Sequence, residues 1–314
     1  MEKLNLVTEW DKTFQKSEKV DHEKVTYENK YGFTLAADVY KPKNASEKLS
    51  AIIICGPYGA VKEQSAGLYA QTLAERGFLT IAFDPSYTGE SSGTPRNTTS
   101  PEINTEDYSA SVDYLVTRED VDEEKIGIVG ICGWGGIALS AAAKDPRIKA
   151  TVGSTAANHS DYNPAQRKQM LAMVAQVRTA EAKTGEIQTT YSTVGEINEE
   201  TPAPQVEFYN YYRNPKRGYH KRGINSGQAI DIASNLGFFH FSLLTYIDQI
   251  ENPVLMVHGE NAFTYAQGKD MFDRLKGDNK KFLTVTGATH TDLYDQVDKI
   301  PFDAIAEFFQ ESLK

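Results

Sequence analysis

The chain has 314 residues, 40% of them hydrophobic and 24% charged, with a formal net charge of −10 and a pI near 5.2. This composition is typical of a soluble globular protein with one large α/β domain plus an insertion, or with two domains. The negative charge argues against general nucleic-acid or anionic-membrane binding. Two cysteines, Cys55 and Cys132, cannot form a disulfide framework, and the first ten residues lack the apolar run of a secretory signal. We therefore expect a cytoplasmic protein without a membrane span.

The first half of the chain alternates between strand and helix patterns, which is typical of a parallel sheet. A polar stretch over residues 1–22 is expected to be an arm or a helix. Residues 24–28 and 33–40 then alternate around Asn29-Lys30-Tyr31-Gly32 and predict a β-hairpin. Further strands are expected at 50–55, 78–83, 125–131 and 148–152, and helices at 67–76, 106–117 and 137–143.

The alternation breaks between residues 159 and 246. We expect helices over 164–183 and 225–246 there, separated by a polar, turn-rich segment at 185–218. Strands resume at 253–258 and 282–286, with a helix through Leu275 and a last helix over 303–312. An insertion between two strands of a continuing sheet is most simply a lid. The predicted organisation is therefore a core of residues 1–158 and 247–314 with an inserted helical lid over 159–246.

The sharp turn after the strand at 125–131 is the most informative stretch. Gly130-Ile131-Cys132 matches the first half of a nucleophile elbow, G-x-S-x-G, with a thiol in place of the hydroxyl. The following helix N-terminus is expected to favour a thiolate at Cys132 and an oxyanion beside it. Trp134 stands where the elbow pattern has a small residue, so two other interpretations remain open. One is a degenerate elbow, and the other takes Gly133 to Ala138 as a G-x-G-x-x-A dinucleotide fingerprint.

The order of these elements and motifs resembles the α/β-hydrolase superfamily. It includes the hairpin, the elbow, a lid, a His-Gly-Glu strand and a late Gly-Ala-Thr-His, over roughly residues 24–158 and 250–312. Gly130-Ile131-Cys132 with Gly135-Gly136 is similar to dienelactone-hydrolase-like members that use a Cys nucleophile. The implied fold is a mostly parallel, doubly wound sheet with an N-terminal β-hairpin and an inserted helical lid.

The resemblance also implies roles for particular residues. His290, after the last strand, occupies the position of the general base. The acid of the superfamily follows the penultimate strand, where Glu260 is nearest; Asp161 and a Cys–His dyad without an acid remain open as alternatives. Backbone N–H groups of Gly133 and Tyr58 are expected to form the oxyanion hole.

The remaining candidates concern substrate contacts and partners. Trp134, Phe239 and His240 are the candidate pocket residues, although a buried helix face explains Phe238-Phe239-His240-Phe241 equally well. The basic and aromatic stretch 208–222 resembles single-strand nucleic-acid binders, but in an acidic protein a lid segment is the better explanation. Cys55 is expected in the core. We expect no metal, because His258 and Cys55 lack the companions of a zinc site, and no cofactor.

The predicted function is hydrolysis of a carboxylic ester, lactone or thioester through an acyl-Cys132 intermediate, with His290 as base. The expected partner is a small-molecule ester or thioester, with no nucleic acid and no membrane; a homodimer is left open. The alternative is a non-catalytic binding protein whose elbow degenerated at Trp134. The substrate itself cannot be named, because specificity resides in the lid and loops.

Overall fold

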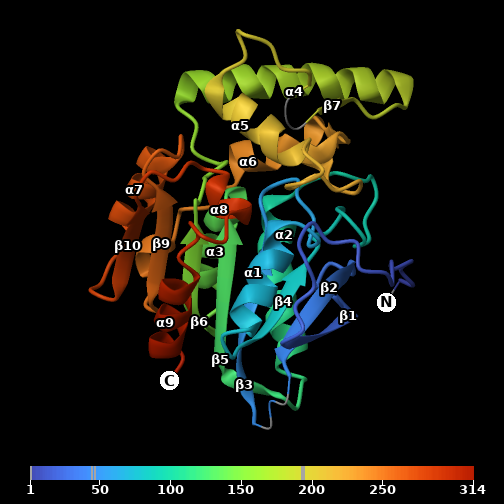
Figure 1. The fold of residues 1–314 in the computed structure, drawn as a ribbon. Helices are drawn as coiled ribbons and strands as arrows, with labels where there is room; N and C mark the ends of the chain where they lie inside the picture. Colours follow the sequence, from blue (N-terminus) through green and yellow to red (C-terminus); the bar gives the residue numbers. More distant parts are fainter. Residues whose placement is uncertain (1, 44, 46, 192–194) are drawn as a thin grey trace.

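A sheet of eight strands forms the centre of the protein (Figure 1). The computed structural model describes residues 2–43, 45, 47–191 and 195–314. The strand order is β1-β2-β4-β3-β5-β6-β9-β10, with β2 antiparallel to both neighbours and all other pairs beyond it parallel. The strands are β1 (Val20–Glu28), β2 (Thr34–Pro42), β3 (Leu49–Cys55), β4 (Leu79–Phe83), β5 (Val121–Ile131), β6 (Ile148–Ser154), β9 (Val254–Gly259) and β10 (Lys280–Val285).

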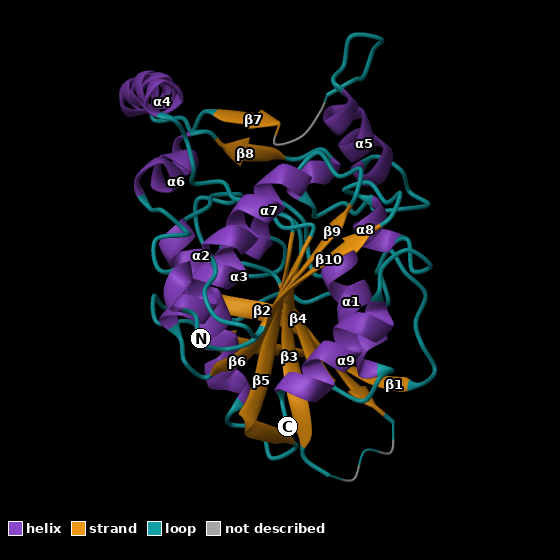
Figure 2. Ribbon diagram, turned by 90° about the vertical axis from the view of Figure 1, so that its left-hand side faces the viewer, coloured by secondary structure: helices purple, strands orange, loops and turns teal. Residues whose placement is uncertain are grey.

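Helices cover both faces of this sheet, as the doubly wound prediction requires (Figure 2). One face carries α2 (Pro101–Leu115), α3 (Gly133–Lys144) and α7 (Tyr265–Arg274); the other carries α1 (Ser65–Ala74) and α9 (Phe302–Ser312). Because strand side chains alternate, Ile53 packs on the first face while Ile52 and Ile54 pack on the second. The predicted fold class and N-terminal hairpin are confirmed.

The segment between β6 and β9 lies across the carboxyl ends of the central strands, at the top of Figure 1. It contains α4 (Pro164–Thr184), β7 (Thr189–Tyr191), α5 (Ala203–Tyr212), η1 (Ile224–Ser226), β8 (Ala229–Asp231), η2 (Ala233–Asn235), α6 (Leu236–His240) and η3 (Ile247–Gln249). Helix α4 was predicted within a residue of its bounds. It starts with a capping box between Asn163 and Gln166 and ends at Gly185 in the left-handed conformation.

Two predictions within this segment were wrong. The expected helix over 225–246 is divided into short pieces, because Gly227 takes a positive φ of 124° and residues 229–231 pair as a strand with β7. The expected turn-rich stretch 185–218 contains the ten-residue helix α5, which starts at a proline-flanked position. Both errors arise where local propensity is weak and packing against the core decides the structure.

The N-terminal arm, described from residue 2 onward, forms neither helix nor strand before β1. It runs along the core, where the Thr13 N–H donates to Glu63 O at 2.9 Å, and within the arm the Trp10 indole N–H donates to Phe14 O. Across the described ranges of the chain, no helix combines the length and apolar character that crossing a bilayer needs.

Candidate active site

The turn between β5 and α3 has the strained backbone of a nucleophile elbow at Cys132. Its φ is 55° and its ψ −124°, a conformation that L-residues rarely adopt. A Cβ on Gly130 would lie 2.1 Å from Trp134 O, and one on Gly135 would lie 2.3 Å from Ala156 Cβ. The close approach of strand and helix therefore requires glycine two residues before and three residues after Cys132.

Trp134 is compatible with this turn because its side chain points into the core. The indole is 2% exposed and packs edge-on between Phe83 and Tyr108, with ring centroids 5.5 and 5.4 Å away. It lies on the α2–α3 side of the sheet, whereas Cys132 belongs to the cluster on the other side. Trp134 is thus a core residue, and the structure does not place it in a pocket as the sequence analysis expected.

The thiol of Cys132 is enclosed and surrounded by donors. Its residue is 7% exposed, and the backbone N–H groups of Gly133 and Tyr58 and the hydroxyl of Tyr294 are hydrogen-bonded toward it. Burial raises the pKa of Cys132 to about 11, and these three donors offset only part of that effect. The expectation of a thiolate stabilised by the helix N-terminus is therefore wrong for this enclosed state, because desolvation outweighs the helix dipole.

The two predicted oxyanion donors, Gly133 and Tyr58, do meet at Cys132. The loop of Tyr58 is held by Asn225 from the inserted segment, whose side-chain amide donates to Tyr58 O at 2.6 Å and whose N–H donates to Gly59 O at 3.2 Å. A Cβ on Gly59, which has a φ of 79°, would overlap the Asn225 side chain. Glycine at residue 59 therefore allows Asn225 of the inserted segment to pack this closely against the Tyr58 loop.

His159 lies over the same donors. A Cβ on Gly133 would stand 2.4 Å from His159 Nε2, and the rings of His159 and Tyr58 are 5.2 Å apart. This Nε2 is buried and has no hydrogen-bond partner within the described residues. Burial lowers the pKa of His159 to about 4, so a neutral imidazole faces the site. The sequence analysis did not single out this residue.

His290 is fully buried, and both of its ring nitrogens are hydrogen-bonded. Nδ1 lies 2.9 Å from the hydroxyl of Thr155 and 2.8 Å from that of Thr264, while Nε2 lies 2.9 Å from the hydroxyl of Tyr294. Burial lowers the pKa of His290 to about 3, and the neighbouring His258 and His159 add to the effect. His290 is therefore neutral at physiological pH, and Tyr294 stands between it and Cys132.

The structure does not bring either candidate carboxylate to His290. Glu260 is exposed and accepts a hydrogen bond from Gly287 N–H at 2.9 Å, and Asp161 pairs with Arg274 at 2.9 Å. Two threonine hydroxyls occupy the position that an acid would take. Tyr294 follows His290 by only four residues and lies in the short helix α8 (Asp292–Asp295), which begins just after it, so proximity in sequence is the one signal that could have found it.

Helix α5 of the inserted segment covers this group of residues. The Phe208 ring lies 5.6 Å from that of His290, and the rings of Tyr211 and Tyr212 lie 5.0 and 6.2 Å from that of Tyr294. From the core side, Phe263 lies 4.5 Å from the imidazole. The aromatic layer desolvates the thiol and the imidazole, which explains the direction of both pKa shifts.

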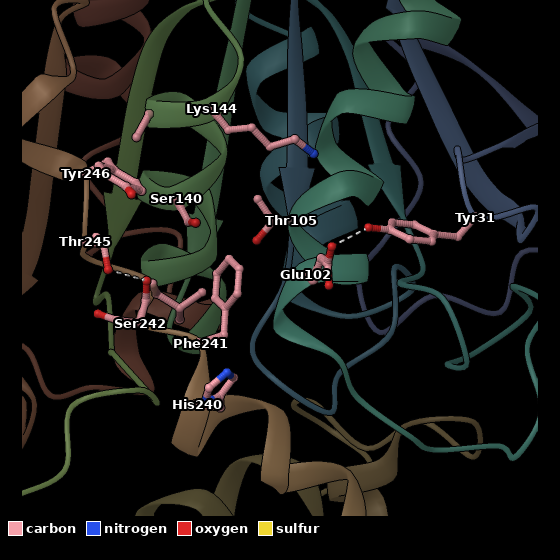
Figure 3. Close-up of a pocket in the computed structure, with 12 residues that line it drawn as sticks. Tyr31, Glu102, Thr105, Ser140, Lys144, His240, Phe241, Ser242, Thr245 and Tyr246 are labelled. Carbon is pink, nitrogen blue, oxygen red and sulfur yellow. Dashed lines mark hydrogen bonds between the residues drawn. The ribbon is translucent and has the colours of Figure 1, made fainter.

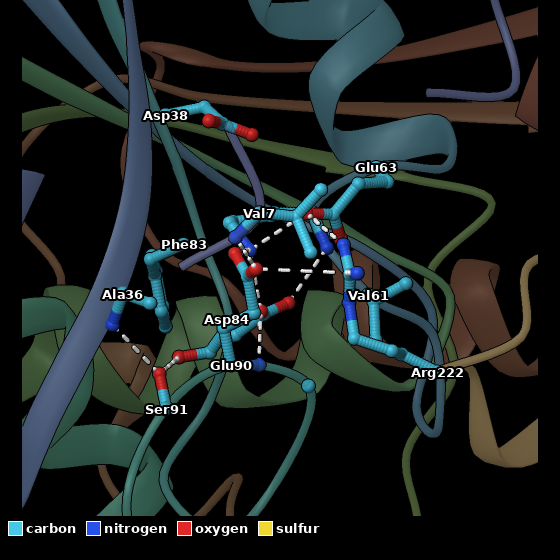
Figure 4. Close-up of polar contacts among 12 residues, drawn as sticks. Val7, Ala36, Asp38, Val61, Glu63, Phe83, Asp84, Glu90, Ser91 and Arg222 are labelled. Carbon is cyan, nitrogen blue, oxygen red and sulfur yellow. Dashed lines mark hydrogen bonds and ion pairs between the residues drawn. The ribbon is translucent and has the colours of Figure 1, made fainter. Parts of the chain in front are cut away.

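A buried ion network surrounds Lys62, four residues after Tyr58, and Figure 4 shows its three carboxylates and Arg222. Glu63, Asp84 and Glu90 place carboxylate oxygens within 4.8 Å of one another, the one such acidic cluster within the described residues. The Lys62 ammonium lies among them, 2.7 Å from each carboxylate, with a side chain that is 0% exposed. Arg222 of the inserted segment joins through Glu63 at 2.7 Å. The three acids that could hold a cation are thus paired with cations of this chain, namely Lys62, Lys24 and Arg222.

One well-formed cavity lies elsewhere, between α2, α3 and residues 240–246 (Figure 3). It has a volume of about 530 Å³, and its lining includes Glu102, Lys144 and His240 but not Cys132. His240 also lines a second cavity of about 480 Å³ beside Thr99 and Arg167. Phe239, the other candidate pocket residue, is buried and packs on Tyr162 with ring centroids 5.0 Å apart.

Comparison with known proteins identifies the family. Residues 32–292 match the family described as X-Pro dipeptidyl-peptidase (S15 family). The chain belongs to the S15 family. Membership supports a hydrolase-type function, and the match covers the elbow, the inserted segment and His290.

Individual proteins are similar to all or part of this chain. The chain is 49% identical to the uncharacterized protein PA2218 of Pseudomonas aeruginosa, over 99% of this chain and 86% of that one. The crystal structure of PA2218 superposes with a TM-score of 0.95 over 100% of both chains. The α/β hydrolase GrgF from Penicillium sp. sh18 superposes with a TM-score of 0.79 at 20% identity, over 93% and 99% of the two chains, so the fold is that of the α/β hydrolases. A shorter match, 34% over 99 residues, joins 32% of this chain to 31% of the thiohydrolase aneE of Aspergillus aculeatus.

Proposed function

We propose that the protein hydrolyses a carboxylic ester, lactone or thioester through an acyl-enzyme on Cys132, with His290 as the general base. One observation carries this proposal. The thiol stands on an elbow at the N-terminus of α3, and the N–H groups of Gly133 and Tyr58 point at it from two different loops. Two converging backbone donors beside a nucleophile are what the oxyanion of an acyl-transfer intermediate needs.

The proposed chemistry has two halves. In the first, the sulfur bonds to the carbonyl carbon, the thiol proton passes to His290, and the carbonyl oxygen takes the electron pair while held by the Tyr58 and Gly133 amides. Collapse of this intermediate expels the alcohol or thiol, which receives the proton back. In the second half, His290 takes a proton from a water molecule that attacks the carbonyl carbon of acyl-Cys132. The C–S bond then breaks, the sulfur regains the proton from His290, and the carboxylic acid leaves.

The neutral state of both groups suits this chemistry. With a pKa of about 11 for Cys132 and about 3 for His290, the resting site holds a thiol and an imidazole rather than an ion pair. The proton must then leave during attack, and an imidazole that is uncharged at neutral pH is available to receive it. Threonines 155 and 264 orient the ring in the role that a carboxylate has in a triad.

His159 is proposed to contact the substrate. Its buried Nε2 lies over Gly133 without a hydrogen-bond partner within the described residues, and a substrate oxygen or sulfur at the oxyanion donors would supply one. His240 stays a candidate for contacts with the outer part of the substrate because it lines two cavities.

The inserted segment, residues 159–246, is proposed to act as the lid. Helix α5 covers His290 and Tyr294, and Asn225 holds the Tyr58 loop, so substrate entry requires this segment to move. Such a lid shields the acylation step from bulk solvent, and the hydrolytic water reaches the acyl-enzyme after the alcohol or thiol has left.

The leaving group decides between ester and peptide chemistry. The S15 family is described as X-Pro dipeptidyl-peptidase, whereas the relative aneE is named a thiohydrolase. An amine must be protonated as it leaves, whereas a thiolate or phenolate departs more readily, so esters and thioesters are the less demanding substrates for this site. This reasoning favours the ester and thioester class over the amide.

The test compares p-nitrophenyl esters, an N-acetylcysteamine thioester and Ala-Pro-p-nitroanilide as substrates for the wild type, Cys132→Ala and Cys132→Ser. We expect the wild type to turn over esters and thioesters faster than the anilide, and Cys132→Ala to fall to the rate of the reagent alone. Faster anilide cleavage would assign a peptidase. A folded wild type that cleaves none of them would support the non-catalytic binding protein.

A further inference from the structure

Tyr294 occupies a position that the proposed mechanism leaves unexplained. Its hydroxyl is 2.9 Å from His290 Nε2, and the same hydroxyl interacts with the Cys132 thiol and affects its pKa, so one side chain faces both reacting groups. The two nitrogens of His290 are otherwise engaged with Thr155 and Thr264 on one side and with this hydroxyl on the other. In this structure, the path for a proton from sulfur to imidazole runs through Tyr294.

We propose that Tyr294 is a catalytic residue that relays the proton between Cys132 and His290. The inference rests on the proposed function. Before attack, the Tyr294 O–H turns from the sulfur to His290 Nε2, and its oxygen accepts the S–H of Cys132. During attack, the S–H proton moves to the Tyr294 oxygen while the Tyr294 O–H proton moves to His290 Nε2. The sulfur forms its bond to the carbonyl carbon, and the displaced π electron pair moves to the carbonyl oxygen. Tyr294 ends the step neutral, with one proton exchanged for another.

The surroundings of Tyr294 favour a relay over a free phenolate base. The residue is 0% exposed, and burial together with nearby Cys132 and Tyr212 keeps the pKa of Tyr294 well above 10. A tyrosinate is therefore disfavoured, whereas a concerted exchange of two protons never creates one. The Tyr294 ring is also fixed, because Tyr211 and Tyr212 pack against it. The preceding residue is held as well, since the Tyr69 hydroxyl donates a hydrogen bond to Leu293 O.

Fixed geometry is needed because proton transfer requires heavy atoms at hydrogen-bond distance. Tyr294 belongs to α8, which begins two residues after His290, so the two side chains come from one rigid turn. Cys132 comes from the β5–α3 elbow.

The alternative function for Tyr294 is occlusion: the ring would block His290 in a closed state and swing away before His290 contacts the thiol directly.

The test uses Tyr294→Phe, which keeps the ring and removes only the hydroxyl. The matched control is Tyr211→Phe, because the Tyr211 hydroxyl is directed to Ser65 and its ring packs on Tyr294. A relay predicts that Tyr294→Phe lowers the rate of acylation, read as the burst of p-nitrophenol, by roughly 10²-fold or more. Adding His290→Ala to Tyr294→Phe should then cost little more than either change alone. Tyr211→Phe should keep an acylation rate within about threefold of the wild type, because the substitution keeps the ring that packs on Tyr294.

A further measurement keeps the proposal falsifiable if Tyr294→Phe fails to fold. The wild-type burst rate measured in mixtures of H₂O and D₂O should depend on the deuterium fraction along a curve, because two protons move in one step. A linear dependence, or a folded Tyr294→Phe with an undiminished burst, would overturn the relay and support occlusion. Cys132→Ala separates the two proposals: if it keeps full activity the acyl-Cys132 mechanism fails, whereas an inactive Cys132→Ala beside a fully active Tyr294→Phe refutes the relay alone.

Discussion

Replacing Lys62 by methionine tests the interpretation of the buried ion network. Lys62→Met keeps the length of the side chain but leaves Glu63, Asp84 and Glu90 without the ammonium that now lies 2.7 Å from each of them. Removing one partner of a buried pair costs about 3–5 kcal/mol because the other charge stays uncompensated. For a chain of this size, at roughly 2 °C per kcal/mol, the melting temperature should fall by about 6–10 °C.

We also expect the difference in stability between the wild type and Lys62→Met to depend on pH in a defined direction. Burial raises the pKa of Glu63, but Lys62 and Arg222 outweigh it and hold that pKa below its usual range. A depressed carboxylate pKa contributes stability above its unfolded value of about 4.3, and that stability is lost as the pH falls through the folded value. Without Lys62 this contribution shrinks, because only Arg222 and Lys12 still lower the pKa of Glu63. The stability gap between wild type and variant should therefore be largest near pH 7 and should narrow below about pH 4.

The assay is urea denaturation at several pH values, followed by circular dichroism, with Lys281→Met as the control. Lys281 pairs with Glu311 at 3.2 Å, but both side chains are more than half exposed, so its loss should change stability by no more than about 0.5 kcal/mol. A loss below about 1 kcal/mol for Lys62→Met at pH 7, or a gap that stays constant with pH, would refute the reasoning.

Three further predictions concern the site itself. Trp134→Ala should lower stability by about 3–5 kcal/mol in thermal melts, since it empties a core position; a change in substrate preference without that loss would place Trp134 in the pocket instead. Thr264→Val should lower kcat by roughly tenfold by loosening His290, while Glu260→Gln should leave kcat within about twofold, and the reverse ranking would restore Glu260 as the orienting acid. Alkylation of Cys132 by iodoacetamide should accelerate about tenfold per pH unit from pH 7 to 10, as a pKa of about 11 requires; a plateau near neutrality would mean a stable thiolate.

The main features of the fold could be predicted because they depend on local patterns. Continuous apolar runs bounded by glycine and charged residues mark the buried strands, and Asn163 with Gln166 marks the start of α4. The pieces that local patterns mispredicted, α5 and residues 225–246, lie in the inserted segment. Their structure depends on packing over the core, with Tyr211 and Tyr212 only 1% exposed, and such packing leaves little trace in local propensity.

The part of the candidate site that could be predicted from the sequence consists of residues that directly follow the carboxyl ends of strands. Cys132, His290 and the two backbone donors were located because the carboxyl ends of parallel strands meet at one edge. Thr155 and Thr264 contact His290 across 135 and 26 residues of sequence, and no local spacing reveals such contacts. The pKa of Cys132 was predicted in the wrong direction, because burial depends on what α5 covers and cannot be read from the elbow alone.

The most direct test of the central claim is to trap the acyl-enzyme. The protein is mixed with a p-nitrophenyl ester, quenched in acid within the burst phase, and analysed by intact-mass and peptide mass spectrometry. The account predicts a mass increase of one acyl group on the peptide that carries Cys132, present in the wild type and lost in Cys132→Ala. Turnover in which no acyl group accumulates on Cys132, together with undiminished activity of Cys132→Ala, would contradict it.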